Sequence, residues 1–180
     1  MKTTLGAFTL ALKASPEQMR RAARNTISRG VTYARQQAVN NISDKAGLKK
    51  KTIRDRMPIR RPTQTEMNGS VSASNKQLPM NAYPTRVQRI SRTRAAVYVH
   101  DGLRGGFRKS ASAFVNPASK NKRKWRRVKG AERYPLDLPA GPSVAVQFED
   151  LMTHFPTYES NLNQFLMDEI EAQLRRQLKL

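Results

Sequence analysis

Apolar residues recur every three or four positions between Met19 and Ile42, which is the period of an amphipathic α-helix. A helix start signal comes just before them. Ser15 can cap the first turn, Pro16 suits the first helical position because no N–H is needed there, and Gln18 can complete a capping box. The pattern predicts a helix of about 25 residues with a narrow stripe of small apolar side chains.

A second, shorter periodic segment covers residues 48–57 and ends before Pro58. Its polar positions are basic and form a candidate second basic patch: Lys49, Lys50, Lys51 and Arg54. A helix–turn–helix module that places this segment in a DNA groove is one interpretation. The first helix is too long for such a module, and no third helix follows to close a small core, so we do not favour it.

Beyond Pro62 the pattern changes to short segments rich in β-branched or aromatic residues, separated by Gly, Pro, Asn and Ser. Strands are expected at residues 67–73, 85–90, 95–100, 113–115 and 124–128. The stretches 74–84 and 102–112 are expected as long loops, which in compact domains are commonly functional or ordered by partners.

Near the C-terminus, residues 142–152 are expected to form a short helix, which Pro156 separates from a last helix with apolar residues every four positions. The fold class is therefore α+β, with a long N-terminal helix packed on a small antiparallel β-sheet or sandwich and a C-terminal helix. We expect one domain over residues 1–180. Its parts are residues 1–14 as an N-terminal arm or strand, 15–57 as a helical segment, 63–140 as a β region with long loops, and 142–180 as C-terminal helices.

The charge of the chain is large and uneven. Thirty-four Lys and Arg face 13 Asp and Glu, so the formal net charge is +21. Residues 149–180 carry six acidic and three basic side chains, which makes them −3, while residues 1–148 are +24. Such a field attracts polyanions, so a nucleic-acid backbone or an acidic protein surface is the expected neighbour. The alternative is a solvated basic surface with no dedicated ligand.

The densest basic run surrounds Trp125. Its candidate contacts to DNA or to an acidic partner are Lys120, Lys122, Arg123, Lys124, Arg126 and Arg127. If residues 124–128 form a strand, alternation places Trp125 on the face opposite Lys124 and Arg126. Trp125 can then stack on a base or lie buried in the domain, and burial is the commoner fate of a lone Trp. We therefore expect it to point into the core.

Catalytic constellations are missing from the sequence. There is no Cys, which excludes disulfides, Cys-ligated zinc and thiol catalysis. His100 and His154 are far apart, and the pair His100–Asp101 is more typical of a strand end than of an acid/base site. Residues 102–106 lack the Lys-Ser/Thr of a phosphate loop and are interpreted as a hairpin connection. We expect no enzyme activity, no cofactor and no metal. No apolar run approaches the ~20 residues that cross a bilayer, so no membrane partner is expected.

Four segments occur in an informative order before the last helix: Ala-Phe-Val at 113–115, Trp-Arg-Arg at 125–127, Arg-Tyr-Pro-Leu-Asp at 133–137 and Gly-Pro-Ser-Val at 141–144. With the long small-residue helix and the short basic helix before them, they resemble the minor tail protein Z family of tailed bacteriophages. The resemblance covers nearly the whole chain.

The resemblance implies a structural virion protein of the tail-completion or head–tail joining type, with no catalytic residues. It implies a homo-oligomeric ring, a hexamer by the symmetry of tails, at the neck or upper tail of the virion. The protein would be made in the bacterial host cytoplasm, and its partners would be other tail or neck proteins and DNA in the channel. Two alternatives stay open, a basic nucleic-acid-binding protein and an enzyme acting on nucleic acid.

Overall fold

The structure is a computed structural model. It describes residues 2–89, 95–100, 106–110, 113–115, 124–127, 136–154 and 156–180. The chain divides into two compact units, each assembled from separated segments. Unit 1 comprises Met1–Ala38, Met57–Ser72 and Met152–Leu180, and unit 2 comprises Val39–Arg56 and Ala73–Leu151. Long helices combine with small antiparallel sheets, which confirms the α+β class.

The helices of the described part are α1 (Lys2–Lys13), α2 (Pro16–Ala46), α3 (Lys50–Arg54), α4 (Val144–His154) and α5 (Thr157–Leu178), with one 3₁₀ turn, η1 (Met80–Ala82). The strands are β1 (Ile59–Arg60), β2 (Ser70–Val71), β3 (Gln77–Pro79), β4 (Thr85–Arg89), β5 (Ala95–His100), β6 (Phe107–Ser110), β7 (Ala113–Val115), β8 (Lys124–Arg127), β9 (Leu136–Asp137) and β10 (Ala140–Ser143).

Helix α2 begins where the sequence predicts. The backbone N–H of Ser15 donates to Oε1 of Gln18 at 2.8 Å, and the backbone N–H of Gln18 donates to Oγ of Ser15 at 3.3 Å. These two bonds are the reciprocal pair of a capping box. The helix ends at Ala46, because Gly47 adopts a left-handed backbone with φ of 66° and its N–H donates to the carbonyl of Ser43.

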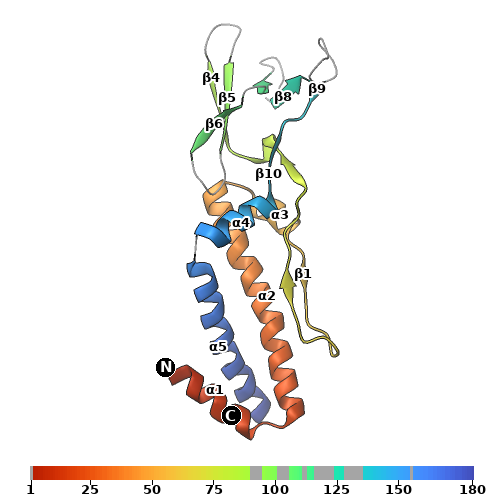
Figure 1. The fold of residues 1–180 in the computed structure, drawn as a ribbon, viewed down its shortest axis with the longest axis vertical. Helices are drawn as coiled ribbons and strands as arrows, with labels where there is room; N and C mark the ends of the chain where they lie inside the picture. The colour runs from red at the N-terminus through yellow and green to blue at the C-terminus, as the bar shows by residue number, and fades with distance from the viewer. Residues whose placement is uncertain are drawn as a thin grey trace. The chain divides into compact units, whose positions relative to one another are not determined.

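The first 14 residues differ from the expected arm or strand, because residues 2–13 form helix α1. In unit 1, α1 lies against α5, and α5 runs beside the first part of α2 (Figure 1). Leu10 of α1 is buried with Ala22 of α2 and Leu174 of α5. A short helix of this kind gains its stability from such tertiary packing rather than from the weak helix propensity of its Thr and Gly residues.

Helices α2 and α5 pack closely along unit 1. The rings of Tyr33 and Phe165 are stacked with centroids 4.1 Å apart. A Cβ at Gly30 would lie 2.5 Å from Cδ2 of Leu166, so only glycine permits this approach without displacing the leucine. The hydroxyl of Tyr158 donates to the carbonyl of Ala34 at 2.8 Å. Burial raises the pKa of this hydroxyl to about 12. The short hairpin β1–β2 completes the unit, with Ile59 paired to Val71.

Unit 2 holds the remaining sheets. Strands β4, β5 and β6 form one antiparallel sheet, β7, β8 and β9 form a second, and β3 pairs with β10. Strand β5 contacts β7, and a buried cluster of Met80, Val97 and Ala113 lies at this junction. The strands predicted at 85–90, 95–100, 113–115 and 124–128 are confirmed by β4, β5, β7 and β8.

Both expected long loops contain regular structure. Residues 74–84 include β3 and η1, and residues 102–112 include β6, which pairs with β5. These segments lack a strong period of their own, and pairing with another strand, the distant β10 for β3 and the adjacent β5 for β6, places them in sheets. The hydroxyl of Tyr83 shows how tightly the first is held, because it donates to the carbonyl of Pro142 at 2.6 Å. Four of the five residues of the hairpin connection interpreted at 102–106 lie outside the described ranges. Strands β5 and β6 on either side of it pair antiparallel, with His100 opposite Phe107.

The capping box gives a first prediction. Replacing Ser15 with Ala removes the acceptor for the Gln18 N–H, so the free energy of unfolding should fall by about 1 kcal/mol. Ser160→Ala is the matched control, because Ser160 is an exposed helical serine whose side chain has no partner in the described part of the chain. Urea denaturation of both variants measures the difference. Equal stabilities for the two variants would contradict the capping role.

Candidate anion-binding surfaces

The four residues of the second basic patch are brought together on and beside α3. Ile53 is fully buried and anchors the helix, while the side chains of all four cations are exposed. Oγ of Ser43 donates to the carbonyl of Leu48 at 2.8 Å and holds the turn that leads into the helix. The patch consists of Lys49, Lys50, Lys51 and Arg54.

The charges of this patch have no counterion within the part of the chain that the structure describes. None of the four side chains forms a hydrogen bond or an ion pair there. Lys50 and Arg54 are four residues apart and Lys51 and Arg54 three apart, and like charges at these spacings destabilise a helix by about 0.2–0.5 kcal/mol per pair. The arrangement suits an external anion, which would relieve this repulsion.

The basic run around Trp125 is described only in part. Lys120, Lys122 and Arg123 lie outside the described residues. The backbone of β8 holds Lys124 and Arg127 in the central strand of its sheet. The DNA-facing role of the run stays a prediction.

Arg126 and Trp125 are described in full. Nη2 of Arg126 lies 2.6 Å from Oδ2 of Asp137 on the neighbouring strand, and both side chains are half-exposed. This hydrogen bond lowers the pKa of the Asp137 carboxyl below its ordinary value. Trp125 is half-buried and pairs in register with Phe114. The cross-strand carboxylate offsets the charge of Arg126, and strand spacing alone did not reveal it.

His100 has a structural environment. Its ring meets Phe107 edge-to-face at 5.2 Å, and the guanidinium of Arg86 lies over the same Phe107 ring at 4.0 Å. Asp101, which follows it in the pair that the sequence suggested to be a strand end, lies outside the described residues. Within those residues, no three side chains of His, Asp or Glu gather as metal ligands would. Of the helices that the structure describes, none combines the length and apolar character that crossing a bilayer needs.

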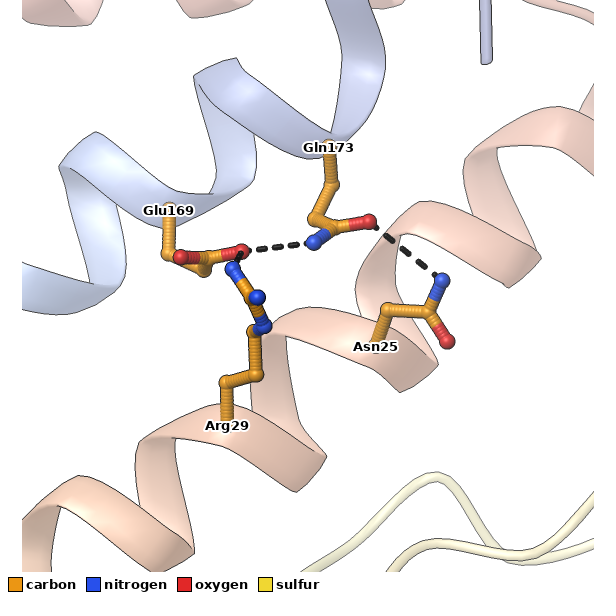
Figure 2. Close-up of polar contacts among 4 residues, drawn as sticks. All are labelled: Asn25, Arg29, Glu169 and Gln173. Carbon is orange, nitrogen blue, oxygen red and sulfur yellow. Dashed lines mark hydrogen bonds and ion pairs between the residues drawn. The ribbon is translucent and has the colours of Figure 1, made fainter. Parts of the chain in front are cut away.

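Unit 1 contains a polar network that the sequence patterns did not indicate. Oε1 of Glu169 accepts from Nη1 of Arg29 at 2.7 Å and from Nε2 of Gln173 at 2.6 Å (Figure 2). Oε1 of Gln173 in turn accepts from Nδ2 of Asn25 at 3.3 Å. The four residues form two i,i+4 pairs on facing helices, but only the packing of α2 on α5 shows that the pairs meet.

The carboxyl of Glu169 is held ionised. Its side chain is only 10% exposed, and burial on its own raises its pKa. The hydrogen bonds from Gln173 and Arg29, together with the charges of Arg29 and Arg176, outweigh burial and lower the pKa below its ordinary value.

Comparison with protein families decides the identity of the chain. The sequence profile described as prophage minor tail protein Z (GPZ) matches residues 11–180. The chain belongs to this family. It is accordingly a structural protein of a phage tail. No curated protein and no solved structure matches the chain.

In this minor tail protein Z family member, the sequence-predicted sites therefore have different outcomes. The patch on α3 is assembled and exposed, whereas the run at 120–127 is described at two side chains, one of them paired with Asp137. The binding role of both sets stays a prediction.

The network around Glu169 gives a pH prediction. A carboxyl whose pKa is lower in the folded than in the unfolded state adds stability above its ordinary pKa, and this stability is lost as the pH falls through the folded value. Glu169→Gln should therefore lower the free energy of unfolding by about 1 kcal/mol near neutral pH. This is the upper end of the range for exposed ion pairs, because Arg29 is half-exposed while Glu169 is largely buried. Its stability should also decline less than that of the parent as the pH drops below about 4.5.

Denaturation at a series of pH values checks this expectation, with Glu159→Gln as the control. Glu159 is an exposed carboxylate on the same helix, and its side chain has no partner among the residues described. Parallel pH curves for the parent and Glu169→Gln would show that the network contributes nothing.

Proposed function

We propose that this chain is a tail-completion or head–tail joining component of the virion. It forms a homo-oligomeric ring, a hexamer matching the symmetry of a tail, at the neck or upper tail. Its basic surfaces face DNA in the channel or an acidic surface of a neighbouring tail or neck protein. The membership in the minor tail protein Z family supports the tail role, and the finer position is our inference.

The observation that carries the proposal is the patch on α3. Three exposed cations on α3 and a fourth, Lys49, just before it have no counterion in the described part of the chain. The whole chain has a formal charge of +21, which opposes self-association in solution. An anionic neighbour would offset the repulsion between copies of the chain, so we expect the ring to form on its partners rather than in isolation.

An open sheet edge supports the oligomer. Among the described strands, β4 lies at the edge of the sheet that it forms with β5 and β6, and its Val87 is 51% exposed. Exposed strand edges pair readily with another chain, and soluble proteins commonly cover or charge them. In the ring, a neighbouring subunit would cover this edge. We assign no catalytic role to the protein.

The second candidate is a basic protein that binds nucleic acid without a tail. The unpaired α3 cations favour it as well, because Lys and Arg supply most backbone contacts to nucleic acids. Salt-dependent DNA binding by the isolated monomer, together with its absence from purified virions, would select this candidate over the tail role.

Complementation of a phage that lacks this gene tests the proposal. We expect the triple substitution Lys49→Gln, Lys50→Gln, Lys51→Gln to leave the melting temperature unchanged, because exposed substitutions of this kind are worth within about 0.5 kcal/mol. The yield of infectious particles should fall on the order of tenfold, which corresponds to a loss of about 1.4 kcal/mol of binding free energy.

The matched control removes three other exposed cations, Lys13, Arg61 and Lys76, whose side chains lack partners among the described residues. This control variant has the same net charge as the α3 triple variant, but it should assemble into particles as well as the parent does. If both variants yield as many infectious particles as the parent, the α3 patch is a solvated surface and the mechanism is wrong.

A further inference from the structure

A polar groove lies between α2 and α5 in unit 1 and includes no residue of the two basic segments described above. Its volume is about 420 Å³. Six side chains line it: Asn25, Ser28, Arg29, Gln173, Arg176 and Gln177. Every one of these side chains carries an N–H or O–H donor, and none is acidic or apolar.

The network of Figure 2 fixes one wall of this groove. Gln173 is 4% exposed and bridges Asn25 to Glu169, and Glu169 binds one nitrogen of Arg29. The Arg29 side chain is still 52% exposed, so its remaining N–H groups are free to meet solvent or a ligand. The buried Glu169 carboxylate orients the half-exposed Arg29 guanidinium and offsets part of its charge.

Arg176 stands on the other side of the groove. Its side chain is exposed and forms no hydrogen bond or ion pair with any described residue, although its charge acts on Glu169. The groove therefore presents two guanidinium groups against one carboxylate, and that carboxylate is covered. The exposed field is positive.

The positive surface continues beyond the groove along α2. Arg21 and Arg35 lie seven residues before and after Ser28, close to two whole turns, so they share the helix face of this groove residue. Glu17 pairs with Arg21, whose side chain is still 58% exposed. Between Arg21 and Arg35 the helix rises about 21 Å at 1.5 Å per residue. This length exceeds one small anion and suits several phosphates of a polymer, whose strands carry one charge per about 3.4 Å of axis.

We propose that the α2–α5 groove binds phosphate groups of a nucleic-acid backbone, with Arg29 and Arg176 as the charged contacts and Asn25, Ser28 and Gln177 as neutral donors. This set matches the residue types that contact phosphate oxygens. Phosphate oxygens are the same at every nucleotide, so contacts of this kind carry no sequence information and the proposed binding is independent of sequence. The inference does not depend on the tail role, since the isolated protein should show it.

Fluorescence anisotropy with a short labelled DNA duplex over a salt series tests this inference. The full-length protein should bind with an affinity that falls steeply with salt. Arg176→Gln, which breaks no described contact of its side chain, should weaken binding and reduce the slope of log K against log salt by about 1. Arg29→Gln combined with Arg176→Gln should reduce it by about 2.

The control Arg61→Gln removes one exposed cation from the same unit and should leave the slope within error of the parent. Melting curves establish that Arg176→Gln is folded, which keeps the test valid if the double variant is unstable. If Arg176→Gln and Arg61→Gln lower the slope of log K against log salt equally, the groove is not the binding site. Displacement of the DNA by poly-glutamate at equal charge concentration would overturn the preference for phosphate.

Discussion

The packing of α5 on α2 is the interaction on which unit 1 depends. The paired positions run in opposite directions along the two helices, from Tyr158 at Ala34 to Gln173 at Asn25, so the helices are antiparallel. Gly30 permits the close approach, and an aromatic stack lies beside it. Because α1 docks on α5, and α5 is held by α2, the N-terminal helix and the polar network both follow from this one contact.

The charged side chains, unlike the packed helices, contribute little to the stability of the fold. The fold uses few of its cations internally, and the ion pairs of the described residues lie mostly at exposed positions, where each is worth about 0.2–1 kcal/mol. The excess charge therefore adds little to folding and opposes compaction and self-association. A tail protein that meets anionic neighbours has a use for such a surface, and this connects the α3 patch with the family assignment.

Local signals predicted local structure well. The capping residues Ser15 and Gln18 located the start of α2, and the β-branched and aromatic residues of Ala95–His100 located β5. Long-range contacts escaped prediction because no local period encodes them. Helix α1 exists through Leu10 in a shared core, β3 through its pairing with β10, and the Arg126–Asp137 pair through strand register. The same holds for the α2–α5 network, whose two halves lie more than a hundred residues apart.

The central claim is that this chain completes a phage tail as an oligomer whose basic surfaces face an anionic neighbour. A cryo-electron microscopy map of the phage whose genome encodes this chain, at a resolution sufficient to trace helices, tests the claim most directly. Our account predicts several symmetry-related copies at the neck or upper tail, with α3 against DNA or an acidic protein surface. A single copy, or a ring whose α3 lysines point into open solvent, would contradict it.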